Sequence, residues 1–302
     1  MDLLQLIERS DCSAQVREQL VMIVAIAVKR NSGQNNDSKG LQIVQRKVQE
    51  FASSSQPQGQ VLAASLICAV VQEYSGTGKS SVIGLSIEGH QKAKKYYENN
   101  CLSDNFTLVM KFLGHLIENP QSVQNFMMVK KFLEIGHLIL SWRFAHGKAS
   151  RISLMREDKT VDVMFNPPDS WKGIVTSGEF LKVWFASHGI VRRSPELGSI
   201  SASCIQQICS MKGSCLHEHE TEAQWAAAMI ELFRGNLPNW MPAQVPYSSL
   251  ISIIFFSGTR VDGLITCFQT FYRKQKCSYL GDDRIVLSSL SFMSRAMDVF
   301  YD

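Results

Sequence analysis

The sequence contains no long hydrophobic run and no regular spacing of cysteines. The longest uninterrupted apolar stretch, Leu20 to Val28, has nine residues, whereas a membrane-spanning helix needs about 20. Eight cysteines are scattered without the spacing of a disulfide framework, and no secretory signal opens the chain. We therefore expect no membrane insertion, and reduced thiols in the cytosol or nucleus.

A strong excess of one charge is also missing. The formal net charge is +4 over 302 residues, and the densest basic groups are Lys92, Lys94 and Lys95 and the pair Arg192-Arg193. A nucleic-acid-binding protein usually carries a longer basic stripe together with aromatic residues that stack on bases. We therefore expect no nucleic acid as a partner, and we interpret the three lysines as a solvated face.

The segment Ser75 to Ser80 reads SGTGKS and resembles the end of a phosphate-binding loop. That motif requires a glycine five residues before its Gly-Lys pair, because the loop wraps backbone N–H groups around phosphates. Glu73 occupies this position, and the segment follows a predicted helix rather than a strand. We therefore expect a flexible turn between helices and no nucleotide site.

One cluster of possible metal ligands occurs, at Cys204, Cys209, Cys215, His217 and His219. The first two cysteines are five residues apart on a predicted helix, so their side chains diverge by roughly 140°. No catalytic Ser/His/Asp or Cys/His motif has supporting context either. The sequence therefore predicts no metal, no cofactor and no enzyme.

Helical periodicity recurs from one end of the chain to the other. We expect the helix over 13–29 to place Val16, Leu20, Ile23, Val24 and Ala27 on one face, and the linker 31–39 to end it. A short helix over 2–8 would expose an apolar edge of Leu3, Leu4, Leu6 and Ile7. Further helices are predicted over 40–52, 60–74, 104–118 (after Ser103 as N-cap), 122–142, 177–188, 195–211, 222–234, 248 or 258–273, and 282–300.

Several side chains within these helices are interpreted as packing residues rather than ligand-binding ones. His115 and His137 lie among Leu, Ile and Phe, which is typical of core or groove positions. The pairs Met127-Met128 and Trp184-Phe185 are interpreted as core.

The segment 151–165 alternates apolar and polar residues around a charged turn and predicts a small β-hairpin-like insertion. Pro167-Pro168 then stops the strand-like run, and Asp169 or Ser170 can cap a new short helix.

Two helices with two turns recur about every 40 to 50 residues, which is the period of armadillo and HEAT repeats. The predicted fold is therefore all-α: an α-solenoid of stacked antiparallel helix pairs. About seven pairs would fill residues 1–302 as a single segment. The alternative, a globular helical bundle, does not ordinarily need so many short elements with evenly spaced polar turns.

Several collinear motifs resemble the exportin-4 branch of the karyopherin-β family. The segment Val16 to Leu20 is similar to one of its helices, and the segment Ile83 to His90 is similar to its motif Ile-Gly-Leu-Ser-Met-Glu-x-His. A third match is a Ser-Trp-x-Phe helix end, a Pro-x-x-Ser-Trp segment and a Phe-rich helix, formed by Ser141, Trp142, Phe144, Pro167, Ser170, Trp171, Phe180, Leu181 and Phe185.

The resemblance implies a nuclear transport receptor that shuttles between nucleus and cytoplasm through the nuclear pore. Implied partners are Ran-GTP, protein cargo such as translation factor 5A or Smad-type regulators, and Phe-Gly nucleoporins. Direction of transport and the Ran-contact residues are not implied. The family's members are much longer, so we expect a fragment or short form that lacks N-terminal and C-terminal repeats, which leaves Ran binding by this chain open. The alternative is a truncated helical-repeat scaffold or adaptor that binds proteins without Ran.

Overall fold

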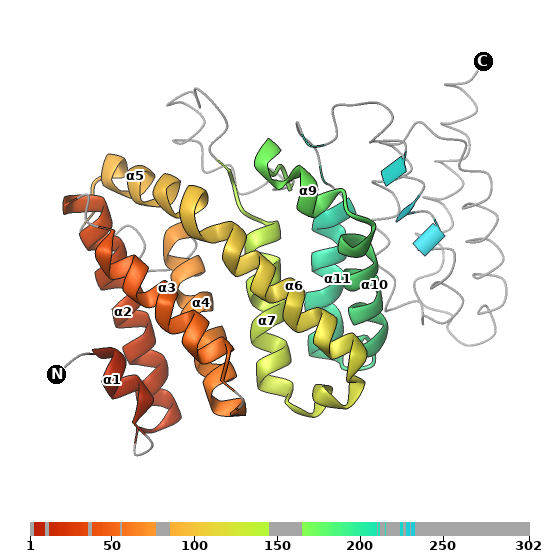
Figure 1. Ribbon diagram of the computed structural model, residues 1–302, viewed down its shortest axis with the longest axis horizontal. Coiled ribbons are helices and arrows are strands. Elements are labelled where there is room, and N and C mark those ends of the chain that lie inside the picture. Colours follow the sequence, from red (N-terminus) through yellow and green to blue (C-terminus); the bar gives the residue numbers. More distant parts are fainter. Residues whose placement is uncertain are drawn as a thin grey trace, which may run out of the picture.

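The computed structural model describes residues 3–9, 12–35, 38–54, 56–76, 85–144 and 165–209, together with 211, 215, 224–225, 228–229 and 231–232. All regular secondary structure within these residues is helical (Figure 1). The predicted all-α fold is therefore confirmed. The β-hairpin predicted at 151–165 lies, apart from Phe165, outside the described residues.

The helices begin and end close to proline, serine and asparagine residues. Pro57, Pro120 and Pro195 each stand at the start of a helix, where a missing N–H costs nothing. The elements are α1 (Leu3–Glu8), α2 (Ala14–Asn35), α3 (Lys39–Ala52), α4 (Pro57–Ser75), α5 (Ile87–Tyr97), the π-helical turn η1 (Glu98–Leu102), α6 (Ser103–Glu118), the 3₁₀ turns η2 (Pro120–Gln124) and η3 (Asp169–Trp171), α7 (Phe126–Leu140), α9 (Lys172–Val175), α10 (Gly178–Val191) and α11 (Pro195–Cys209).

These helices form two layers (Figure 1). In one layer α2, α4, α7 and α11 follow one another, and each packs against the next. In the other layer α3 packs on α4, α6 on α7 and α10 on α11. The described residues thus contain the stacked antiparallel pairs α3–α4, α6–α7 and α10–α11, the architecture of an α-solenoid. The expected total of about seven pairs over the whole chain stays a prediction.

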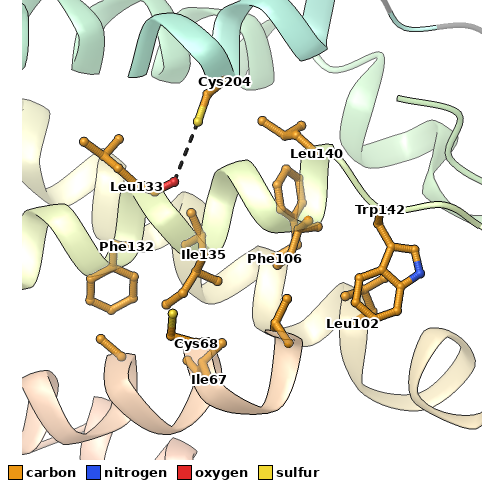
Figure 2. Packing of buried hydrophobic residues seen from close by; sticks show 14 of the residues in the cluster. Ile67, Cys68, Leu102, Phe106, Phe132, Leu133, Ile135, Leu140, Trp142 and Cys204 are labelled. Carbon is orange, nitrogen blue, oxygen red and sulfur yellow. Dashed lines mark hydrogen bonds between the residues drawn. The ribbon is translucent and has the colours of Figure 1, made fainter. Parts of the chain in front are cut away.

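The core runs along the middle of the first layer, where α7 is covered on two sides. Figure 2 shows Ile135 and Phe132 of α7 facing Ile67 and Cys68 of α4. On the opposite side the Cys204 thiol of α11 donates to the Leu133 carbonyl oxygen, at 3.7 Å (Figure 2). The sequence FMMVKKFLEIGHLIL fits this central place, because it gives α7 apolar side chains on most sides and confines Lys130, Lys131 and Glu134 to one side.

Helices α5 and α6 form one continuous rod, which differs from the prediction of a helix start at Ser103. Ser103 has helical dihedral angles of −61° and −42°, so it is not an N-cap. No glycine or proline lies between His90 and Leu113 to break the helix. The π-helical turn Glu98–Leu102, whose hydrogen bonds span five residues instead of four, connects α5 to α6 without a break.

Helix α2 extends six residues beyond the predicted end at Lys29, through the segment that was expected to be a linker. Tertiary contacts override the low helix propensity of this segment. The Ser32 hydroxyl lies 3.2 Å from the Tyr74 hydroxyl. A side chain at Gly33 would lie 2.8 Å from the Gly89 carbonyl oxygen, so only glycine lets α2 and α5 approach this closely.

The predicted buried face of α2 is wrong. Val16, Ile23 and Ala27 are exposed and Leu20 is half-buried, whereas the side that packs inward carries Val21, Val24 and Ala25. Only Val24 belongs to both sets. The nine-residue apolar run offers a hydrophobic stripe on every side of the helix, so periodicity alone does not select the buried one.

The apolar edge expected on the first helix is also largely covered. Leu4 and Ile7 are buried, while Leu3 and Leu6 are half-buried. α1 lies on α2, and Arg17 of α2 donates to the carbonyl oxygens of Ile7, at 3.0 Å, and Arg9, at 2.9 Å. These two bonds cap the end of α1.

Ser177 caps α10, and its removal gives a first test of the local structure. Its hydroxyl accepts the Phe180 backbone N–H at 3.3 Å. We expect Ser177→Ala to lower the free energy of unfolding by about 1 kcal/mol, because one N–H at the helix start loses its acceptor. Ser203→Ala, which removes a mid-helix bond to the Ser199 carbonyl, serves as the control in urea unfolding and should change stability by less than about 0.5 kcal/mol. Equal effects would contradict the cap assignment.

Candidate functional site

Three of the residues that carry the family resemblance, Phe144, Trp171 and Phe180, meet at one place, which we call the aromatic junction. It consists of Phe106, Phe144, Phe165 and Trp171, with Phe180 at its edge. The Trp171 ring centroid lies 5.2 Å from Phe106 and 5.4 Å from Phe144, and Phe106 lies 6.1 Å from Phe180. The junction therefore joins α6, α10 and the segment that leads to α9.

Trp142 follows the C-terminus of α7 and is buried. Its indole N–H donates to Glu98 Oε1 at 2.7 Å, and its ring lies 5.8 Å from Tyr97. The neighbouring Ser141 forms the C-cap of α7 and its hydroxyl is buried. Trp142 thus fixes the end of α7 against the π-helical turn.

The Pro-x-x-Ser-Trp segment turns the chain from the aromatic junction into α9. Pro167 is buried and Ser170 is exposed. The expected cap at Asp169 or Ser170 is wrong: both lie inside η3, and its N-cap is Pro168, which makes no side-chain cap. The fixed dihedral angles of proline set the start of this turn without a capping side chain.

The Phe-rich helix α10 contributes packing rather than an exposed surface. Phe180, Phe185 and Trp184 are each buried. This confirms the core interpretation of Trp184-Phe185. Of the nine motif residues, only Ser170 is exposed, so their arrangement holds helix pairs together.

The three lysines Lys92, Lys94 and Lys95 were predicted to form a solvated face, and for Lys94 this prediction is wrong. Its Nζ lies 5.2 Å from the centroid of the Trp142 ring and donates to the Arg143 carbonyl oxygen at 2.7 Å. Burial lowers the pKa of this lysine. Lys92 and Lys95 are exposed, as expected. A cation over an indole face stabilises the end of α7.

A second polar cluster lies between α2, α4 and α5. Lys29 is buried, and its Nζ donates to the Glu73 carbonyl oxygen and lies 4.0 Å from the Glu73 carboxylate. Burial lowers the pKa of Lys29 to about 8. Glu73, the residue that argued against a phosphate loop, therefore has a structural role as the partner of a buried lysine.

His90 gives the protein a predictable response to acid. Burial, together with the nearby cations Lys29 and Lys94, lowers its pKa from 6.5 to about 4. Between these values the unfolded chain binds the proton and the folded chain does not, so stability falls as pH decreases from 6.5 to 4. We expect His90→Gln to flatten this part of the curve in thermal unfolding at a series of pH values. Parallel curves for the two proteins would contradict the assignment.

An extended hollow, which we call the α3–α6 groove, has a volume of about 650 Å³. Its floor is apolar and includes Phe112 and Phe132, whose rings stack at 4.0 Å. The polar groups around it are mainly on α3 and α6. The lining residues are Gln49, Ala52, Ser53, Gln60, Ile67, Asp104, Thr107, Leu108, Lys111, Phe112, His115 and Phe132.

Two smaller hollows lie on the other layer. One of about 330 Å³ includes His137 and Glu134 of α7 together with Ser199 of α11. The other, of about 200 Å³, lies between α2, α4 and α7 and includes Met127. Both predicted groove histidines therefore line hollows. Met127 is 52% exposed, so its core interpretation is wrong, whereas that of Met128 is confirmed.

Two described members of the cysteine cluster, Cys204 and Cys215, face separate protein acceptors. Cys204 donates to Leu133 of α7, and Cys215 donates to the carbonyl oxygens of Pro167, at 3.6 Å, and Pro168, at 3.2 Å. Burial raises the pKa of both thiols. His217 and His219 lie outside the described residues, as do positions 77–80 of the SGTGKS segment. Ser75 ends α4, and Gly76 follows with φ of 86°.

No helix in the described part of the chain is long and apolar enough to cross a membrane.

Comparison with known proteins gives the same family as the motifs. A curated relative, exportin-4 from Dictyostelium discoideum, is 21% identical over 203 residues, which cover 63% of this chain and 18% of the relative. The chain thus matches less than a fifth of that relative's length. A family model described as Exportin-4 matches residues 5–243. Because this match covers well over half of the sequence, the chain belongs to the exportin-4 family.

Proposed function

We propose that this chain acts as part of a nuclear transport receptor that carries protein cargo through the nuclear pore under the control of Ran-GTP. The observation that supports this most is the family match over residues 5–243, together with a two-layer stack of helix pairs. In such a stack, small rotations between neighbouring pairs add up to a large change in curvature.

A change in the curvature of the stack would couple the binding of Ran-GTP to the binding of cargo. If Ran-GTP and cargo favour the same curvature, each increases the affinity of the other by the same factor. Nothing in this scheme needs a reacting side chain, which agrees with the buried, structural character of the motif residues. No residue is assigned to Ran or to cargo.

The α3–α6 groove is the place where we propose that Phe-Gly nucleoporins dock. It lies between neighbouring helix pairs, and its apolar floor, with Leu108, Phe112 and Phe132, suits an aromatic side chain. Aromatic rings prefer offset-stacked or edge-to-face arrangements. A bound phenylalanine ring would add a third ring to the stacked Phe112–Phe132 pair in this way. Asp104 and Lys111 at the rim have opposite charges, so the groove favours an uncharged segment.

Binding of a Phe-Gly repeat polypeptide to the purified chain tests this assignment. Leu108 is half-buried in the groove, and Leu108→Glu should weaken binding at least about tenfold, or 1.4 kcal/mol, because a bound ring would bury a carboxylate. Ile43→Glu on α3, which is 48% exposed and does not line the groove, is the matched control. Unchanged affinity in a folded Leu108→Glu variant would reject the groove as the docking site.

The second candidate is a helical-repeat scaffold whose partners do not respond to Ran. It is kept because the match covers only 18% of exportin-4 from Dictyostelium discoideum, so the response to Ran is itself part of the proposal. The two candidates differ in one measurable property, the effect of Ran-GTP on binding of protein partners.

A further inference from the structure

A small group of polar side chains joins α3, α5 and α6 inside the protein. Asn105 of α6 is 1% exposed, although the buried residues nearest to it in the same helix, Phe106 and Val109, are apolar. The Gln45 Nε2 of α3 donates to the Asn105 Oδ1 at 2.8 Å, and the Asn105 Nδ2 donates to the Tyr97 hydroxyl oxygen of α5. We call Gln45, Asn105 and Tyr97 the Asn105 network.

The Asn105 network contacts both neighbouring helix pairs. The Tyr97 ring is fully buried and stacks on Tyr74 of α4, with the ring centroids 4.7 Å apart. It also lies 5.8 Å from Trp142, which follows α7. α4 belongs to the pair α3–α4 and α7 to the pair α6–α7. The network therefore ties the two pairs together from within.

A buried amide at Asn105 selects one position of α3 relative to α6. A leucine of similar size would fill the same space without needing any hydrogen-bond partner. When α3 moves away from α6, the Asn105 Oδ1 loses its donor and stays buried, which costs free energy. The network therefore penalises other relative positions of these two helices.

The Asn105 network lies at the edge of the α3–α6 groove. Gln49, one turn after Gln45 in α3, and Asp104, next to Asn105 in α6, both line the groove. In the described part of the chain α3 packs on α4 and α6 packs on α7, but α3 and α6 hardly pack on each other. The Gln45–Asn105 hydrogen bond thus joins two helices that the groove otherwise separates.

The width of the groove should depend on this hydrogen bond. Neighbouring pairs of a helical stack can rotate relative to each other, which changes the distance between α3 and α6. The attraction between a bound ring and the groove wall falls steeply when a gap of a fraction of an ångström opens. A groove whose walls are fixed in advance therefore binds a ring more tightly than one whose walls move apart.

We propose that the Asn105 network sets the width of the α3–α6 groove and thereby its affinity for Phe-Gly segments. This inference rests on the proposed docking of such segments in the groove. Gln45 and Asn105 do not line the groove, so they are positioning residues that act through the placement of α3 and α6.

A variant that removes the whole network without leaving a polar atom unpaired tests the proposal. It combines Gln45→Leu, Asn105→Leu and Tyr97→Phe, and its urea unfolding midpoint should stay close to that of the wild type. We expect it to bind a Phe-Gly repeat polypeptide at least about fivefold more weakly. Gln42→Leu, the same change at an exposed position of α3 outside the groove, is the matched control and should bind like the wild type.

A second variant and a second measurement keep the proposal testable if the triple variant does not fold. Gln45→Glu changes only the half-buried end of the network, and a carboxylate cannot donate to the Asn105 Oδ1. It should weaken binding of the polypeptide in the same way. Without ligand, the backbone amides of α3 and α6 should exchange hydrogen for deuterium faster in Gln45→Glu than in Gln42→Leu.

The outcomes separate this inference from the proposed docking site. Folded network variants that bind the polypeptide as tightly as the wild type, or whose α3 and α6 amides exchange as slowly as in Gln42→Leu, would overturn the role of the network. A wild-type chain that binds no Phe-Gly polypeptide would reject the docking site, and the exchange rates would still decide whether the network fixes α3 relative to α6.

Discussion

Replacing Trp171 with alanine is expected to lower the free energy of unfolding by about 3–5 kcal/mol. Trp171 is 2% exposed, and its ring packs on Phe106 of α6 and on Phe144 and Phe165, which flank the segment between α7 and α9. Alanine would leave a cavity bounded by aromatic rings from different parts of the chain. These rings are held by separate elements and cannot all close the gap, so the cost should be near the upper end.

Urea unfolding, followed by far-UV circular dichroism, measures this effect. Trp171→Phe keeps most of the buried area and should cost less than the alanine variant. Ile87→Ala is a control at a site that is 68% exposed, and it should change stability by less than about 0.5 kcal/mol. If Trp171→Ala were as mild as Ile87→Ala, the aromatic junction would not hold α6 and α10 together.

The second large effect is expected at Gly136, where adding one methyl group should destabilise the protein by about 1–3 kcal/mol. A Cβ atom at this position of α7 would lie 2.5 Å from the indole ring of Trp184 and 3.4 Å from Val109. Trp184 is 1% exposed, so its ring has little room to move. The clash should exceed the gain in helix propensity, which is about 1 kcal/mol for glycine to alanine.

Gly114→Ala provides a control of opposite sign. Gly114 lies within α6, and a Cβ there would meet nothing within 4 Å. This substitution should stabilise the protein by up to about 1 kcal/mol, since only helix propensity changes. Trp184→Phe combined with Gly136→Ala should recover part of the loss, because the smaller ring frees space. Equal shifts in the unfolding midpoint for both glycine variants would refute the close packing of α7 on α10.

The sequence was sufficient to predict those helices whose first and last residues are set by neighbouring prolines, caps and apolar spacing. Helix α3 matches its predicted range within one residue, and α6 ends at its predicted last residue, Glu118. Helix α4, predicted over 60–74, spans Pro57–Ser75. Proline, caps and apolar spacing act within a few residues, so a sequence shows them directly.

The errors concern features that arise from contacts between helices. The continuation of α2 past Lys29 depends on the close approach of Gly33 to Gly89 in α5. The rod from α5 to α6 depends on a π-helical turn that local propensity does not indicate. Lys94 was predicted to be solvated because the end of α7, with Trp142, is 48 residues away in sequence.

The candidate site also has one part that the sequence shows directly and one part that only the packing of helices creates. The motif residues could be named from the sequence, because the resemblance is carried by consecutive segments. The α3–α6 groove could not, since its lining comes from α3, α4, α6 and α7. His115 was expected to lie in the core or a groove, and this is the one groove residue that sequence reasoning singled out.

The most direct test of the proposed transport function is a pull-down of protein partners by the purified chain, with and without Ran locked in the GTP state. The transport proposal predicts that Ran-GTP binds the chain and that the yield of cargo rises with it, because the two ligands favour the same curvature. Partners that bind equally well in both conditions, with no retained Ran, would contradict it and favour a helical-repeat scaffold.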